Sequence, residues 1–258
     1  MWLALLFESK SHEAFFQGAS GCLVFSFAQN SENEDGDKLP CSVTKAMIDS
    51  MQDPQATKTY LALCDGDGSW NGIDYLQKGW FSFDKPVKDE FGKFPRNYEI
   101  ILQCGMKAFN FLFSTIGNMM EDCRTDIRFI ASKMLPPTED DPENLEGRKV
   151  SIVLARPHTG RWHQVRQHLS SGTIGHAILG DSSHGRSRTN RIWKKKRHLI
   201  KERTCLHLAR VQLLATEYTP DGIDVSCPLA PDLMKMLNEM PELLDEARPI
   251  LSEEGIKI

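Results

Sequence analysis

One eleven-residue segment constrains this chain more than any other part of it. Residues 159–169 (T-G-R-W-H-Q-V-R-Q-H-L) gather two arginines and two histidines around a short apolar pattern. A β-favouring apolar run that includes Val153 precedes the segment, and Pro157 and Gly160 punctuate the join between the two. We therefore expect Arg161 to lie where a strand gives way to a helix. Polar groups at this density seldom serve a core alone.

The helix that should follow carries an arginine suited to an anion. Trp162, Val165 and Leu169 fall at helical spacing, which predicts one apolar face. Arg166 then lies one turn from His163. A guanidinium offers a planar fork of donors that matches a carboxylate or a phosphate, and it stays charged even when buried. We expect Arg166 to hold a negative group.

The histidines in and around this segment raise the alternative of a metal site. His163 and His168 are close in sequence, and His158, His176 and His184 are near them. The H-x4-H spacing does not match the usual ligand pairs, the chain has no C-x2-C pair, and the segment holds no acidic residue. We predict no metal, and the histidines remain open to a structural role in hydrogen bonding.

Three further strings follow in order. Residues 174–185 (I-G-H-A-I-L-G-D-S-S-H-G) come first, then Asn190-Arg191, then residues 206–209 (L-H-L-A). Together with the first segment they resemble the RluA-type RNA pseudouridine synthases, which carry G-R-x-H-Q-x-R-x-H, G-H-P-I-x-G-D and L-H-A in this order. The G-D-x-x-H-G ending is most similar to the tRNA pseudouridine synthase C branch. The resemblance implies isomerisation of uridine to pseudouridine in structured RNA, expected to be tRNA, without a cofactor.

Two upstream strings fit the same resemblance, so that the matched segments run with gaps from Gly18 to about Leu237. Residues 18–25 (G-A-S-G-C-L-V-F) would follow the nucleophile, and residues 58–63 (K-T-Y-L-A-L) would hold the active-site tyrosine, Tyr60. By the same resemblance Tyr60 would stack on the flipped uridine and assist proton transfer. Arg166 would orient the nucleophilic carboxylate.

The nucleophile motif is the departure from the family pattern. The family has H-R-L-D-R before its G-x-S-G string, and this chain has E-A-F-F-Q at residues 13–17, so Phe16 takes the place of the nucleophilic aspartate. Glu13 lies three residues away, an offset that a strand or turn does not absorb. Without the carboxylate, Arg166 is expected to lack its partner, at a cost of a few kcal/mol if buried.

Two hypotheses for the function stay open. In the first, the protein is an RNA pseudouridine synthase whose catalytic strand is missing from this sequence through a fault in the gene model or in splicing. In the second, it is a catalytically inactive RNA-binding relative. We expect the chain with Phe16 to be inactive in either case, because uridine isomerisation needs a carboxylate at the sugar.

The chain is expected to form one synthase-like domain with unusual additions. Residues 1–17 make an atypical N-terminus, residues 18–240 the domain, and residues 241–258 a C-terminal tail. An insertion at about residues 94–121 is either intron-derived or specific to the lineage. Its apolar part, residues 98–120, predicts a buried helix and a strand, because Gln103, Lys107 and Asn110 interrupt any membrane span.

Charge is unevenly distributed in this chain of 258 residues with a net charge of −4. Residues 186–203 hold nine Lys or Arg against one acid, Glu202. Since this basic segment follows the G-D-x-x-H-G string, we expect it on the rim of the same cleft, contacting RNA phosphates rather than serving as a nuclear-import signal. The residues predicted to bind RNA are Arg161, His163, Gln164, His168, Arg191, Lys194, Lys195, Lys196, Arg197 and His207.

Cysteine usage and the N-terminus bear on the compartment. The seven cysteines are scattered singly, which favours a reducing environment. The apolar start at residues 1–7 is too short for a secretory signal and lacks a basic start. We predict a cytoplasmic monomer with no membrane contact, and leave an organelle address open in case the true N-terminus is missing.

Local patterns predict the remaining elements. A helix capped by Ser42 spans residues 42–51, strands span residues 60–63 and 150–154, and Pro231 opens a helix with one apolar face. Polar loops span residues 30–40 and 136–146. Strands separated by both short loops and helices predict the α+β class, with a mixed, largely antiparallel central sheet flanked by helices, as the resemblance also implies.

Overall fold

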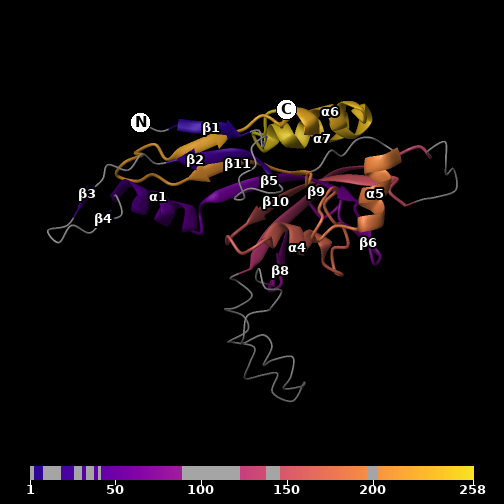
Figure 1. Cartoon of the computed structure of the whole chain (residues 1–258), viewed down its shortest axis with the longest axis horizontal. Coiled ribbons are helices and arrows are strands. Elements are labelled where there is room, and N and C mark those ends of the chain that lie inside the picture. Colours follow the sequence, from indigo (N-terminus) through magenta and orange to yellow (C-terminus); the bar gives the residue numbers. More distant parts are fainter. Residues whose placement is uncertain are drawn as a thin grey trace, which may run out of the picture.

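The computed structural model of the chain describes residues 3–7, 19–25, 31–32, 38–39, 42–88, 123–137, 146–196 and 203–258 (Figure 1). Its strands are β1 Leu3–Phe7, β2 Ser20–Phe25, β3 Ser31–Glu32, β4 Lys38–Leu39, β5 Thr57–Asp65, β6 Ser69–Trp70, β7 Ile73–Asp74, β8 Phe81–Asp84, β9 Arg124–Met134, β10 Lys149–Pro157, β11 Leu206–Leu213 and β12 Ile223–Ser226. Its helices are α1 Ser42–Gln52, α4 Gln164–Ser170, α5 Ser187–Lys196, α6 Pro231–Asn238 and α7 Pro241–Glu253.

One eight-stranded sheet organises the molecule. The strand order is β1-β2-β11-β5-β10-β9-β8, with β12 also paired to β11. β2 runs parallel to β11, and every other pairing between the described strands is antiparallel. The α+β class with a mixed, largely antiparallel sheet is therefore confirmed. Two short hairpins, β3-β4 and β6-β7, lie outside this sheet.

Helices cover both faces of the sheet, which explains why its central strands are apolar on both sides. Consecutive residues, which point to opposite faces, have no exposed surface on both strands: Leu61, Ala62, Leu63 and Cys64 on β5, and Ile152, Val153, Leu154 and Ala155 on β10. In Figure 1, α6 and α7 lie on one side of the sheet and α4 and α5 on the other. A strand buried on both faces reads as a continuous apolar run rather than an alternating one.

Most of the elements predicted from local patterns are confirmed. The helix from Ser42, the two strands and the helix that begins at Pro231 are all present, and β5 and β10 extend further than predicted. The predicted loop at residues 30–40 instead contains the β3-β4 hairpin. Residues 98–120, the insertion at 94–121 and most of the acidic loop lie outside the described residues. No helix in the described ranges has the length and apolar character to cross a membrane.

The prediction of a C-terminal tail from residue 241 is wrong. These residues form α7, whose Leu243, Leu244, Ala247 and Leu251 are buried in the main core. The periodic leucines are the physical reason, because an amphipathic stripe gains stability when it packs on a sheet. The last residues of the chain are thus part of the domain.

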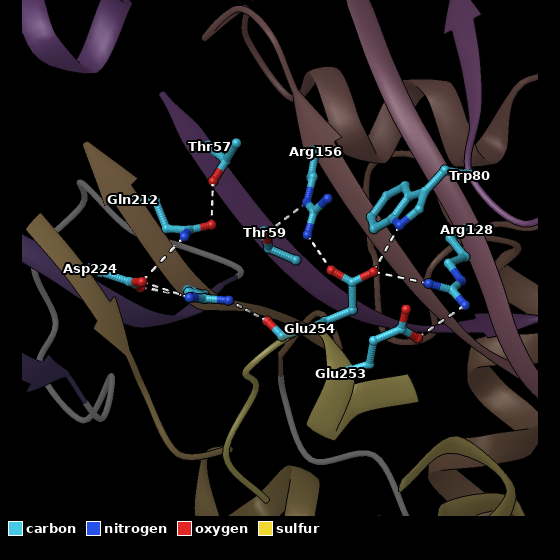
Figure 2. Close-up of polar contacts among 10 residues, drawn as sticks. Thr57, Thr59, Trp80, Arg128, Arg156, Gln212, Asp224, Glu253 and Glu254 are labelled. Atoms are coloured by element: carbon cyan, nitrogen blue, oxygen red, sulfur yellow. Dashed lines mark hydrogen bonds and ion pairs between the residues drawn. The ribbon is translucent and has the colours of Figure 1, made fainter. Parts of the chain in front are cut away.

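A single carboxylate fastens the end of α7 to the sheet (Figure 2). Glu254 accepts hydrogen bonds from Trp80 Nε1 at 2.8 Å and from Arg128 at 3.0 Å, and Arg156 binds its other oxygen. The Arg156 guanidinium also lies over the Trp80 ring, 4.2 Å from its centroid. Because Arg128 belongs to β9 and Arg156 to β10, this carboxylate joins two strands to the C-terminal helix.

We expect Glu254→Ala to lower the free energy of unfolding by about 1–3 kcal/mol, because two arginines lose a hydrogen-bonded carboxylate. Glu253→Ala is the matched control. The Glu253 side chain is 67% exposed and 3.6 Å from Arg128, so its loss should cost less than about 0.5 kcal/mol. Urea denaturation of both variants measures the difference, and equal losses would contradict the role given to Glu254.

Candidate functional site

The polar segment singled out in the sequence lies at the junction between β10 and α4. β10 ends at Pro157 and α4 begins at Gln164, which confirms the predicted junction at Arg161. Helix α4 is bound to β9 through one threonine, because Gln164 Nε2 donates to Thr125 Oγ1 at 3.0 Å and His168 Nδ1 lies 2.9 Å from the same oxygen. The segment is therefore held against the sheet.

Trp162 departs from the predicted helical face. Val165 and Leu169 are buried as expected, but Trp162 precedes the helix and remains 39% exposed. The reason is His163, the residue before the helix, which adopts the left-handed conformation with φ +50°. Helical spacing therefore does not extend back to position 162.

Arg166 is buried and bound to a carboxylate. Its Nε and Nη2 donate to the two oxygens of Asp181 at 2.7 and 2.6 Å. The side chains are 8% and 0% exposed. A two-bond contact of this kind is the strongest arrangement of the pair. The expectation that Arg166 lacks a carboxylate partner is wrong, because Asp181 from the G-D-x-x-H-G string supplies one.

A tight turn fixes Asp181 in front of the guanidinium. Its Oδ1 also accepts hydrogen bonds from the backbone N–H groups of Ser183 and His184, both at 2.9 Å. Asn190, within the predicted basic segment, donates to the Asp181 carbonyl at 2.8 Å. Burial alone would raise the pKa of Asp181, but the hydrogen bonds from Arg166 and the turn outweigh it and lower that pKa.

Two histidines extend the network from Arg166 toward the surface. Arg166 Nη1 lies 2.7 Å from His163 Nε2, and His163 Nδ1 lies 3.0 Å from His184 Nε2. Because arginine only donates, His163 Nε2 must accept, and its Nδ1–H then donates to His184. This chain of bonds requires a neutral imidazole. Burial and the neighbouring Arg166 and His184 lower the pKa of His163 to about 4, in agreement with that requirement.

Tyr60 lies on the sheet face that α4 covers, in line with the string at residues 18–25. It stands opposite Ala155 on β10 and opposite Leu208 on β11, and Leu208 is itself opposite Gly21 on β2. Two strand spacings, about 10 Å, therefore separate Tyr60 from Gly21. The Tyr60 side chain is half-buried, and burial raises the pKa of its hydroxyl.

A second polar cluster ties the start of β2 to β11. Ser20 Oγ lies 2.8 Å from His207 Nδ1 and accepts a hydrogen bond from Arg203 at 3.1 Å. Arg203 is also paired with Asp232 at the start of α6. The string that follows position 16 is thus anchored to the L-H-L-A string.

Three of the residues predicted to contact RNA are buried. Gln164, His168 and His207 are at most 3% exposed, and their polar atoms are bound within the protein. Direct RNA contact by these side chains is incompatible with their burial. They hold α4 and β2 in place instead, which is the structural role that the sequence left open for the histidines.

The other predicted contacts lie at the surface or outside the described residues. Arg161, Arg191, Lys194 and Lys195 are exposed, the last three on α5, and His163 is half-buried. The Lys196 side chain, Arg197 and Phe16 lie outside the described residues. Sequence reasoning did not name Asp181, His184 or Trp162 as site residues, although the first two stand in the G-D-x-x-H-G string.

A separate cavity of about 210 Å³ lies away from Arg166. Its lining includes Asp65, Trp70, His176 and Arg186. Asp65 is paired with Arg186 at 3.0 Å and accepts a hydrogen bond from Thr189. The charged groups of this cavity are satisfied within the protein.

Comparison with known sequences shows the family of this chain. The family model for RNA pseudouridylate synthase matches residues 17–171, more than half of the chain. The tRNA pseudouridine synthase C of Salmonella typhi is 38% identical over 90 residues, which are 34% of this chain and 32% of that protein. The enzyme of the same name from Yersinia pestis is 40% identical over 68 residues (26% and 25%). Ribosomal large subunit pseudouridine synthase D of Zymomonas mobilis is 42% identical over 69 residues (25% and 19%).

A solved structure shares the fold. The human RNA pseudouridylate synthase domain containing 4 superimposes with a TM-score of 0.50 at 14% identity, over 86% of this chain and 72% of that one. The human RNA pseudouridylate synthase domain containing 1 has a TM-score of 0.48 at 18% identity, over 91% of this chain and 78% of that one. The sequence relatives are matched over a third of their length or less. From the match over residues 17–171 and the ordered motifs around Arg166, the chain belongs to the RNA pseudouridylate synthase family, in its RluA-type branch.

Proposed function

We propose that this chain binds structured RNA of the tRNA class and holds a uridine next to the buried Arg166–Asp181 pair without isomerising it. One observation carries the proposal. Among the described residues the carboxylate bound to Arg166 is Asp181, and its side chain is fully buried. The Asp181 carboxylate is bound to Arg166 and has no exposed surface with which to reach a ribose.

The chemistry of isomerisation explains why accessibility decides the outcome. The reaction breaks the bond between ribose C1′ and uracil N1, turns the base and forms the bond from C1′ to uracil C5. C5 then releases its proton and N1 takes one up, so that the product is an isomer of uridine. A carboxylate must assist at the sugar while the base is detached. Asp181 already accepts four hydrogen bonds and has no exposed surface. The sequence has Phe16 at the place of the family's nucleophile.

Charge and position support RNA as the ligand. Helix α5 presents Arg191, Lys194 and Lys195 to solvent, and Asn190 on the same helix is bonded to the Asp181 turn. Cationic side chains beside the site match the phosphate backbone. Tyr60, half-buried on the sheet face under α4, offers a ring to an extruded uracil.

An active synthase is the second candidate function. It is favoured by Tyr60, Arg166 and Asp181. Each of these residues stands in a string that resembles a family motif, and the strings follow the order of the family. In that case the carboxylate comes from outside the described residues. Turnover measurements separate the two candidates.

Binding is tested by titrating a pool of unmodified tRNA transcripts at several salt concentrations. We expect the double variant Lys194→Gln/Lys195→Gln to bind more weakly and to flatten the slope of log affinity against log salt by up to about 2, since each lost phosphate contact removes about one unit. Lys235→Gln/Arg248→Gln, which removes two exposed charges from α6 and α7, is the matched control and should leave the slope unchanged. An equal change in both variants would overturn the placement of the RNA.

Turnover is tested by tritium release from tRNA labelled at uracil C5. We expect none above background from the chain as it stands. Tritium release that scales with protein concentration and disappears in Tyr60→Phe would establish the active synthase instead. Phe16→Asp then asks whether the remaining site is competent once a carboxylate is restored at that position.

A further inference from the structure

Trp162 is an exposed aromatic ring next to the proposed site. The large apolar side chains exposed in the described part of the chain are Ile48, Met134, Trp162 and Leu214, and only Trp162 is aromatic. Trp162 stacks on His163, and His163 is hydrogen-bonded to Arg166. Trp162 is therefore connected to the proposed site through one residue.

One face of the indole is covered and held. His163 stacks on it with ring centroids 3.9 Å apart and an interplanar angle of 26°, and His184 meets it edge-on at 5.6 Å. With these two contacts in place Trp162 as a whole is still 39% exposed. Because His163 covers one face of the ring, we infer that the opposite face carries much of this exposure. A flat π face presented in this way is the surface on which nucleobases stack.

The platform is rigid before any ligand arrives. Both ring nitrogens of His163 are bonded, one to Arg166 and one to His184. Gln167 Nε2 donates to the Trp162 carbonyl at 2.9 Å, and the backbone at His163 is in the left-handed conformation. Such a backbone conformation persists where the surrounding structure enforces it, often at ligand sites. A ring fixed in advance loses little entropy on binding.

Two exposed cationic residues are linked to Trp162, one by sequence and one through Gln167. Arg161 precedes Trp162 and is exposed. The Lys88 backbone is bonded on both sides to Gln167, the residue that also holds the Trp162 carbonyl, and Lys88 is exposed as well. Positive charge beside a bare aromatic face favours a nucleic acid over an apolar protein partner or a neutral ligand.

We propose that Trp162 is a stacking platform for a nucleobase of the bound RNA that neighbours the target uridine, with Arg161 and Lys88 near the adjoining phosphates. The inference rests on the proposed RNA-binding function. It adds a subsite: the base on Trp162 is held by its π face, which every base has, so the subsite contributes affinity and position rather than sequence preference.

Trp162→Ala and Trp162→Leu test the subsite against Trp162→Phe, which keeps a flat ring. We expect alanine and leucine to raise the Kd for the tRNA pool by about 5- to 150-fold, and phenylalanine by less than about threefold. Leucine keeps apolar volume, so a loss there isolates the π face. The slope of log affinity against log salt should stay unchanged in all three, because stacking releases no counterions. Met134→Ala, exposed on β9 and 44% accessible, is the matched control.

Tryptophan fluorescence gives a second readout. In Trp80→Phe, which removes the indole near Glu254 on the far side of the sheet, RNA should still quench the emission, and adding Trp162→Phe should abolish most of that quenching. Normal affinity in Trp162→Leu, in a parent that binds the tRNA pool, would overturn the platform and leave the proposed function standing. A parent that binds no RNA would overturn both. Quenching by anionic vesicles in place of RNA would show a membrane as the true ligand.

Discussion

Asp181→Ala is expected to lower the free energy of unfolding by about 3–5 kcal/mol, because it leaves the Arg166 charge buried without its partner. The guanidinium side chain is 8% exposed, and two of its nitrogens donate to the carboxylate that would be lost. The backbone N–H groups of Ser183 and His184 would lose their acceptor as well. Chemical denaturation monitored by circular dichroism measures the effect.

An exposed ion pair provides the control for this prediction. Asp245 lies 3.7 Å from Arg248 on α7, with side chains 71% and 54% exposed, so Asp245→Ala should cost about 0.5 kcal/mol or less. Arg166→Met/Asp181→Leu removes both charges and should recover part of the loss, because no ion then stays buried alone. A double variant as unstable as Asp181→Ala would mean that the turn, not the charge pair, supplies the stability.

The same pair has a defined pH dependence. The pKa of Asp181 is lowered in the folded chain, since the hydrogen bonds it accepts outweigh the effect of burial. Its contribution is therefore fully present above the unfolded value of about 3.9 and is lost as the pH falls through the folded pKa. The difference in stability between the parent and Asp181→Ala should be constant at neutral pH and should shrink in acid. A difference that grows as the pH falls would have the wrong sign for this assignment.

Local chemistry made the elements around the site predictable from the sequence. Pro157 and Gly160 placed the junction between β10 and α4, and Pro231 placed the start of α6. Proline and glycine restrict or free the backbone only within a few positions, so a short window of sequence is enough to predict where these elements end and begin. The same holds for Val165 and Leu169, which are buried at the predicted spacing.

The partner of Arg166 could not be predicted in the same way. The pairing with Asp181 depends on how the turn at residues 181–185 folds back on α4, and this follows from backbone N–H groups that a sequence pattern does not display. Trp162 was misplaced for a similar reason, because the left-handed backbone at His163 interrupts the helical period. The parallel pairing of β2 with β11 joins residues 187 positions apart, as the bond from Ser20 to His207 shows. Pairings at that range need the whole fold.

Gly21→Ala is expected to be the second large loss of stability, about 3 kcal/mol or more. Gly21 has φ +127°, and a Cβ there would stand 2.2 Å from the carbonyl oxygen and 2.6 Å from the nitrogen of Leu208. These are backbone atoms of β11, which cannot move without disturbing its pairing with β5. Backbone strain and the forced contact each contribute about 1–3 kcal/mol.

Gly79→Ala separates the two contributions, because Gly79 also has a positive φ, +62°, but has open space around the site of a Cβ. This control carries the strain alone and should cost about 1 kcal/mol. Thermal and urea unfolding compare the stability of the two variants, and titration with tRNA compares their affinity for RNA. Since Gly21 stands in line with Leu208 and Tyr60, displacement of β2 should weaken RNA binding in Gly21→Ala and leave it unchanged in Gly79→Ala. Equal stability of the two variants would mean that β2 is not packed against Leu208, and the alignment of Tyr60 with the string at residues 18–25 would have to be abandoned.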